Sequence, residues 1–181
     1  MRGLIFTELL TMAETTMGED AVDDILDELP LSTDGAYTSV GNYPGAEFLA
    51  IVSAICMKTG AIIDDYLQRF GSWMMSRMSQ THKTFFSEKD DALAALEAVD
   101  GELRTEVHKL YPDEIVPNLN TKRIDENAIE MTYHSDRSFS AFLLGMVQGC
   151  VDFFGQTAEV TAIELAGGSP GNAAFQVRLK G

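Results

Sequence analysis

The sequence predicts an α+β fold, in which a helical N-terminal part precedes a small antiparallel sheet with one helix packed on it. Two observations support this prediction. Up to residue 110 the apolar residues recur at the spacing of amphipathic helices, whereas after Pro112 the runs become short, alternating or β-branched and are separated by turn residues. The 181 residues suffice for one substantial core but are few for two, so we expect a single domain spanning residues 1–181.

The N-terminal region is expected to contain two helices and a connection. Residues 4–12 place their apolar side chains along one side of a helix. Residues 22–29 form a second apolar stripe, opposite a face of Asp and Glu, and Pro30 ends that helix. Residues 31–44 are rich in Ser, Thr, Gly and Asp, which predicts a connection rather than a strand.

Three longer helices are expected next. Residues 46–58 form an apolar helix, and Gly60 supplies the left-handed turn after it. A helix that starts near Ala61 carries a stripe of large, soft side chains, which suits a crowded core or the wall of an irregular cavity. Residues 90–110 form a long amphipathic helix, which ends at Pro112.

The C-terminal region is expected to form the sheet. Residues 124–133 and 158–179 carry strand-like runs, interrupted by the turn signals Asp-Glu-Asn and Gly-Gly-Ser-Pro-Gly. Residues 138–154 lie between them and are apolar over a length that exceeds an ordinary strand. The predicted order is therefore strand, strand, helix, strand, strand.

Charge and composition argue against a nucleic-acid-binding protein and against a membrane protein. Acidic residues number 28 against 13 basic ones, which gives a formal charge of -15, so the surface should repel nucleic acid and anionic lipid. No run approaches the roughly 20 apolar residues of a membrane span. Because the first residues also lack the apolar run of a signal peptide, we expect a cytoplasmic protein with no nucleic-acid or membrane partner.

Catalytic and zinc-binding patterns are missing from the sequence. Its one stretch with the letters GxSxG is the Gly-Gly-Ser-Pro-Gly turn signal, which is not a recognisable frame for a nucleophile, and it has no glycine-rich phosphate loop. It also has no CxxC or HExxH motif, and its two cysteines, Cys56 and Cys150, each lie within an apolar run. We therefore expect a protein that is not an enzyme and has no structural zinc site.

One short polar cluster stands out at the end of a predicted strand. Alternation along the strand places Tyr133, Ser135 and Arg137 on one face, with two hydroxyl donors and a guanidinium directed to one place. Arg can bind a carboxylate in a fork while the hydroxyls add neutral hydrogen bonds. A polar, exposed strand face is the alternative interpretation of the same pattern.

Several segments in order resemble one known family. They are Met1-Arg2-Gly3-Leu4-Ile5-Phe6, Tyr43-Pro44 with Glu47-Phe48-Leu49, Arg69-Phe70-Gly71, Leu110-Tyr111-Pro112 with Pro117, and Tyr133, Ser135 and Arg137. Together they resemble the heme-nitric oxide/oxygen binding (H-NOX) family, the regulatory domain of soluble guanylate cyclases and of bacterial relatives. The resemblance covers nearly the whole chain, and the combination is more specific than any one segment.

The resemblance implies a cofactor, a signal and a partner. The cofactor is a buried heme b, held between a distal helical part and a proximal part, with a histidine of the long helix bound to its iron. The Tyr-x-Ser-x-Arg signature, here Tyr133, Ser135 and Arg137, holds the heme propionates in the family. Binding of a diatomic gas such as nitric oxide would be relayed to a histidine kinase or a cyclic-dinucleotide enzyme.

The position that the resemblance gives to the iron ligand holds Arg104, seven residues before Tyr111. Arginine stays protonated in proteins and offers no lone pair to a metal. His108 lies one helical turn later and is the candidate axial ligand, although reaching the iron from there needs a shift of about 5 Å along the helix. An ordinary helical histidine is the alternative for His108.

Three interpretations of the function therefore stay open. The first is a heme-based gas sensor with an unusual iron ligand, whose cofactor site comprises Tyr133, Ser135, Arg137, Arg104 and Pro117. The second is a heme-free homologue that acts as a protein-interaction module. In the third, the same pocket binds a different carboxylate-bearing, apolar ligand.

Overall fold

The computed structural model describes residues 1–99, 101, 118–134, 139–163 and 172–180. In chain order its elements are α1 (Gly3–Met17), α2 (Glu19–Asp27), α3 (Gly45–Thr59), α4 (Ile63–Thr81), α5 (Lys83–Ser87), α6 (Ala92–Ala98), β1 (Asn118–Asp125), β2 (Ala128–His134), α8 (Ser140–Phe153), β3 (Thr157–Ile163) and β4 (Ala173–Lys180). The α+β prediction is confirmed. The chain divides into unit 1, Met1–Phe70, and unit 2, Gly71–Gly181. Within the described ranges, no single helix is long and apolar enough to cross a membrane.

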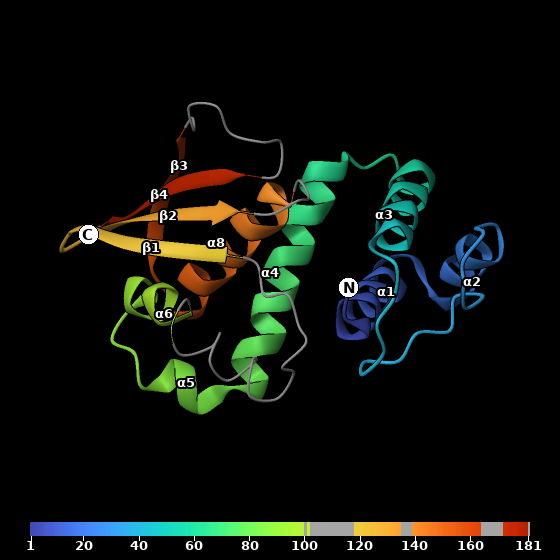
Figure 1. Ribbon diagram of the computed structural model, residues 1–181, viewed down its shortest axis with the longest axis horizontal. Helices are drawn as coiled ribbons and strands as arrows, with labels where there is room; N and C mark the ends of the chain where they lie inside the picture. The colour runs from blue at the N-terminus through green and yellow to red at the C-terminus, as the bar shows by residue number, and fades with distance from the viewer. Residues whose placement is uncertain (100, 102–117, 135–138, 164–171, 181) are drawn as a thin grey trace. The chain divides into compact units, whose positions relative to one another are not determined.

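Unit 1 packs its helices around aromatic side chains, with α1, α2 and α3 grouped together (Figure 1). Phe6 of α1 stacks on Tyr37 with 4.4 Å between the ring centroids and meets Phe48 of α3 edge-on at 5.9 Å. Phe48 in turn lies 5.9 Å from Phe70 of α4. Aromatic pairs at these separations stabilise a core beyond the area they bury.

The connection of residues 31–44 is tied to the start of the chain. The amino group of Met1 donates a hydrogen bond to the Tyr43 carbonyl at 2.8 Å, and the Gly3 N–H donates to the Gly41 carbonyl at 2.8 Å. A Cβ atom on Gly3 would overlap the Thr38 carbonyl oxygen, so this close approach requires glycine. The predicted connection is confirmed, and backbone pairing holds it in place.

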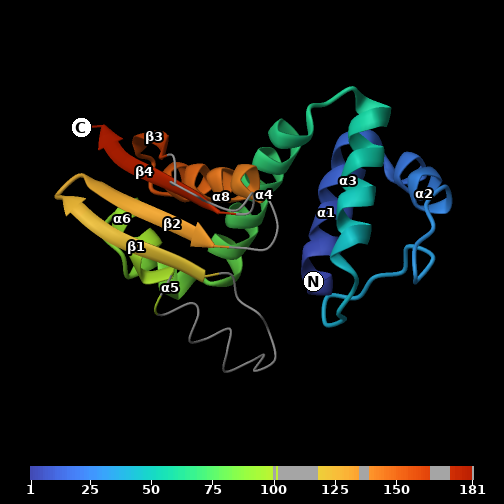
Figure 2. The same cartoon turned by 45° about the horizontal axis from the view of Figure 1, so that its top comes forward.

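Unit 2 is built on a four-stranded antiparallel sheet in the order β1-β2-β4-β3 (Figures 1 and 2). Along β2, Ile129, Met131 and Tyr133 are buried, and the residues between them are partly exposed. Met131 lies opposite Phe175 of β4 in the register. The period of two confirms that one face of the sheet is covered and the other is open to solvent.

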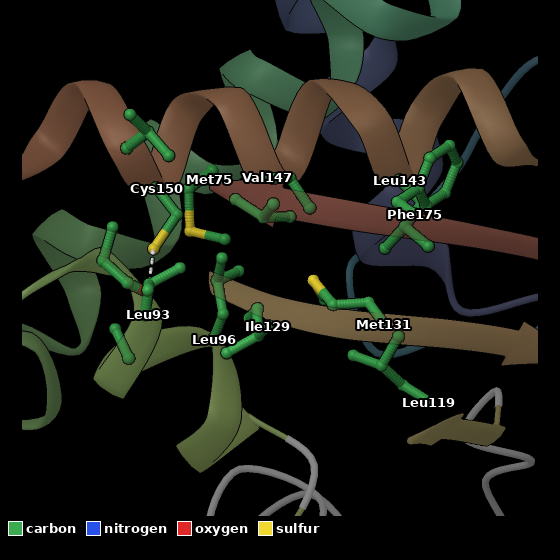
Figure 3. Packing of buried hydrophobic residues seen from close by; sticks show 14 of the residues in the cluster. Met75, Leu93, Leu96, Leu119, Ile129, Met131, Leu143, Val147, Cys150 and Phe175 are labelled. Atoms are coloured by element: carbon green, nitrogen blue, oxygen red, sulfur yellow. Dashed lines mark hydrogen bonds between the residues drawn. The ribbon is translucent and has the colours of Figure 1, made fainter. Parts of the chain in front are cut away.

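The covered face forms a core with residues of α4, α5, α6 and α8. Figure 3 shows Val147 and Cys150 of α8 directed toward the side chains of the sheet and of α6. The Cys150 thiol lies 3.9 Å from the Ala92 carbonyl oxygen, and it is a free thiol within a buried cluster. Burial raises the pKa of Cys150 to about 12, with a smaller contribution from Asp91, so this thiol stays protonated and packs as an apolar group.

Helices α4 and α8 meet backbone to backbone. A Cβ atom on Gly71 of α4 would overlap the Phe142 carbonyl oxygen of α8. One residue later, the Ser72 hydroxyl donates to the Gly145 carbonyl at 2.9 Å. Glycine at position 71 therefore sets how closely the two helices approach.

Two boundaries differ from those that the sequence predicts. Strand β1 begins at Asn118, although the strand pattern begins only at Ile124, because pairing with β2 holds a segment that is mostly polar. Helix α4 begins at Ile63, two residues after Ala61. Of the predicted helix over residues 90–110, Ala92–Ala98 is helical as α6, and residues 100 and 102–117 lie outside the described ranges.

Candidate ligand-binding site

Tyr133 lies near the C-terminal end of β2, on the covered face of the sheet. Its side chain is 6% exposed, and its register partners are Leu119 of β1 and Ala173 of β4. The next residue, His134, is exposed. A buried phenol at the end of a strand can present its hydroxyl to a ligand while its ring packs in the core.

The other residues of the predicted cofactor site lie outside the described ranges. They are Ser135, Arg137, Arg104, Pro117 and His108. The convergence of Tyr133, Ser135 and Arg137 on one carboxylate therefore stays a prediction, as does any role of His108 toward a metal. The described structure contributes the position of Tyr133 to that site.

Two of the three histidines can be located. His82 is exposed immediately before α5, and His134 is exposed at the end of β2. A histidine that binds a buried metal needs to be enclosed and oriented by a second group. Within the described ranges, no group of three His, Cys, Asp or Glu side chains could hold a metal ion.

Unit 1 contains a polar pair that sequence reasoning missed. The Tyr37 hydroxyl donates to Glu47 Oε2 at 2.8 Å, and the Ser32 N–H donates to Glu47 Oε1 at 3.0 Å. Burial, reinforced by Glu47, raises the pKa of Tyr37 well above its usual value. Burial alone would raise the pKa of Glu47, but the hydrogen bonds from Ser32 and Tyr37 outweigh it and lower that pKa. The pair is a charge-assisted anchor for the connection of residues 31–44.

Tyr66 of α4 differs from Tyr37 in that its buried hydroxyl lacks a hydrogen-bond partner among the described residues. Its side chain is 3% exposed, and its hydroxyl has no hydrogen-bond partner in the described part of the chain. Burial raises the pKa of Tyr66 to about 12, and Cys56 of α3 adds to that shift. The phenol therefore stays neutral, and its unsatisfied hydroxyl is a cost to unit 1.

Neither tyrosine could be assigned from the sequence. Tyr37 lies in a connection without periodicity, and Glu47 is one of 28 acidic residues, so nothing in the pattern pairs them. Tyr66 belonged to a stripe of large side chains for which an ordinary core is sufficient explanation. Neither residue provides a catalytic base, because both phenols are held in the protonated form.

A protein-family comparison matches most of the chain. The family model described as Haem-NO-binding matches residues 2–162. A comparison with curated proteins gives no significant match.

Solved structures of similar fold cover the whole chain. The Fe(II) unliganded H-NOX protein of K. algicida is 26% identical, with a TM-score of 0.91 over 100% of this chain and 97% of that one. The S. oneidensis H-NOX protein in the Fe(II)NO ligation state is 23% identical, with a TM-score of 0.89 over 100% of both chains. An oxygen-binding H-NOX domain related to soluble guanylate cyclases is 22% identical, with a TM-score of 0.83 over 100% of this chain and 96% of that one.

Proposed function

Because the chain belongs to the Haem-NO-binding (H-NOX) family, whose domains are heme-based gas sensors, we propose that it is a sensor domain that holds heme b by its propionates. The observation that supports this proposal best is Tyr133, which is buried at the end of β2 where the Tyr-x-Ser-x-Arg motif begins. The heme, when bound, supplies an iron that can take up a diatomic gas. The protein would then have to hold the heme propionates and to change its conformation when the gas binds.

The residues for the carboxylates fit this cofactor. Tyr133 offers a neutral hydroxyl donor from a rigid strand, and Ser135 and Arg137 follow it at alternate positions. Arg137 supplies the positive charge and the two parallel donors that a carboxylate accepts best. We propose that these three residues carry the affinity for the propionates, and that Pro117 also belongs to the cofactor site.

The residue for the iron does not fit the family. Arg104 stands where the family has its histidine, and a guanidinium has no lone pair for a metal. His82 and His134 are exposed, which makes them poor ligands for a buried iron. We propose His108 as the residue that would bind the iron if the protein holds the iron by a histidine.

A second function is favoured by Arg104 itself. Together with Arg137, it would bring a second permanent cation to the site. Such a site suits a heme-free homologue that acts as a protein-interaction module or that binds another carboxylate-bearing, apolar ligand. In either case the chain regulates a partner rather than catalysing a reaction.

The signalling context follows from the family. We propose that the protein works in the cytoplasm as a single domain, that nitric oxide is the gas, and that the partner is a histidine kinase or a cyclic-dinucleotide enzyme. This proposal about the gas and the partner rests on membership of the family. A fold by itself does not fix a function, because particular sites carry it. The site residues that bear on it are Tyr133, Arg137 and Arg104.

Titration with hemin tests the proposal. The ultraviolet-visible spectrum of the purified protein would be recorded with increasing hemin, for the natural protein and for Arg104→His, Tyr133→Phe and Arg137→Ala. The heme proposal predicts a stoichiometric Soret band in the natural protein that weakens in Tyr133→Phe and Arg137→Ala, and His108→Ala then tests the ligand. A Soret band that forms only in Arg104→His would refute it and support the heme-free regulator.

A further inference from the structure

Three large apolar side chains lie exposed within seven residues, where α3 ends and α4 begins. Met57 is 79% exposed, Ile62 is 67% exposed and Ile63 is 44% exposed. The chain turns sharply here, since the axes of α3 and α4 differ by 113° and Gly60 is left-handed. Exposed apolar residues are ordinary when scattered singly, but a group rimmed by polar residues marks an interaction site.

The fold of unit 1 does not require these side chains to be apolar. The buried residues of α3 end with Ile55 and Cys56, and Met57 lies off that stripe. On α4 the first buried residues are Tyr66 and Leu67, after Ile62 and Ile63. The three apolar side chains therefore contribute little to the core, and their hydration is a cost that binding can remove.

The surroundings of this group are strongly acidic. Asp64 and Asp65 are exposed in the first turn of α4. Helix α2 lies alongside, because Lys58 Nζ is 3.3 Å from Asp24 Oδ2 and 3.3 Å from the Ala21 carbonyl oxygen. The charge of Lys58 is thus compensated by Asp24, and α2 carries a further row of exposed carboxylates. That row consists of Glu19, Asp20, Asp23, Asp27 and Glu28.

We infer that this corner docks a partner protein through an amphipathic helix whose apolar face is flanked by Lys and Arg. The corner, called here the α3–α4 corner, consists of Met57, Ile62, Ile63, Asp24, Asp64 and Asp65. The inference rests on the proposed role as a regulator of a partner, and it adds the chemistry of that partner. Apolar contacts supply the affinity, and the carboxylates attract and orient the basic helix. The same carboxylates disfavour an anionic membrane.

A designed peptide provides the probe. It is a labelled helix of about 18 residues, roughly five turns, with Leu on one face and Lys on its flanks. A second peptide carries Glu in place of Lys. Fluorescence anisotropy with the full chain is expected to show saturable binding of the Lys peptide, weakened by salt, and no binding of the Glu peptide.

Substitutions locate the binding to the corner. Met57→Ser with Ile62→Ser is expected to weaken the Lys peptide roughly tenfold or more, since such anchors dominate small interfaces. Val40→Ser is the matched control, because Val40 is 72% exposed elsewhere in unit 1, and it should leave binding unchanged. Asp64→Asn with Asp65→Asn should reduce the salt dependence, whereas Glu14→Gln, an exposed carboxylate of α1, should not.

Other occupants would give different results. If Val40→Ser weakens the peptide as much as the corner variants do, the peptide binds exposed apolar side chains in general rather than the corner, and the inference fails. It also fails if the corner binds phosphatidylcholine–phosphatidylserine vesicles better than the peptide, or if sedimentation shows a dimer that only the corner variants dissociate. Hemin titration of Ile62→Ser separates the two proposals, because the docking variant is expected to keep the spectrum of the natural protein.

Discussion

The connection of residues 31–44 in unit 1 is held by polar contacts, whereas the sheet of unit 2 is held by an apolar face. In unit 1, Tyr37 and Ser32 converge on the buried carboxylate of Glu47. In unit 2, ion pairs such as Arg178 with Asp125 at 2.8 Å lie near the solvent, and the core is apolar and mostly aliphatic. An irregular segment needs directional bonds to specify one conformation, but a strand obtains its register from which side chains are buried.

The close approach of α4 to α8 in unit 2 gives the largest expected effect. Gly71→Ala would force α4 away from the Phe142 carbonyl oxygen, and we expect it to lower the free energy of unfolding by about 3 kcal/mol. Urea denaturation followed by circular dichroism measures this change. Gly101→Ala is the control, because no described residue lies within 4 Å of a Cβ at that position. Equal losses in the free energy of unfolding for the two variants would show that the close approach of the α4 and α8 backbones does not determine the stability of unit 2.

The polar anchor of unit 1 comes next. Tyr37→Phe removes a donor to a buried carboxylate, which is expected to cost about 2 kcal/mol because hydrogen bonds to charged groups exceed neutral ones. The ring remains, so its stacking on Phe6 should survive. Thermal unfolding of Tyr37→Phe and Tyr37→Ala, compared with the natural protein, separates the contribution of the hydroxyl to stability from that of the ring. If Tyr37→Phe left the stability unchanged, the hydrogen bond from Tyr37 to Glu47 would not be what holds the connection.

Acid should weaken the same anchor. The folded protein lowers the pKa of Glu47 below 4.5, so its carboxylate stabilises the fold above about pH 4.5 and this contribution is lost as the pH falls through the lower, folded-state pKa. Glu47→Gln should therefore cost about 1 kcal/mol near pH 7, and the cost should shrink below about pH 4.5. Urea denaturation across this range measures the difference, with Glu14→Gln as the exposed control. A cost that does not depend on pH would show that the charge of Glu47 is irrelevant.

Tyr66 offers the smallest effect and the clearest contrast with Tyr37. Tyr66→Phe removes a hydroxyl that has no partner among the described residues, so we expect stability to stay the same or to rise by up to about 1 kcal/mol. Parallel urea denaturation of Tyr66→Phe and Tyr37→Phe makes the comparison direct. Destabilisation by Tyr66→Phe as large as that by Tyr37→Phe would reveal a partner for this hydroxyl.

Much of the fold could be predicted because its signals are local. Helical spacing identified α1 to α4, and an apolar run too long for a strand identified α8. The first part of β1 escaped prediction, since Asn-Leu-Asn-Thr-Lys-Arg carries no strand pattern and is held by pairing with β2 and by burial of Leu119 in the core. Of the candidate site, the structure locates Tyr133, and the assignments of Ser135, Arg137, Arg104, Pro117 and His108 stay predictions from the sequence.

The sequence by itself determined the helical periodicity, the acidic charge and the presence of Arg104 at the position to which the resemblance assigns the iron ligand, because each is a property of neighbouring or single residues. Only the tertiary structure decided that Tyr37 meets Glu47, that Gly71 meets the backbone of α8, and that Met57 and Ile62 remain exposed. These outcomes depend on which surfaces meet when the chain packs. Contacts between residues that are distant in the sequence leave no periodic trace in it.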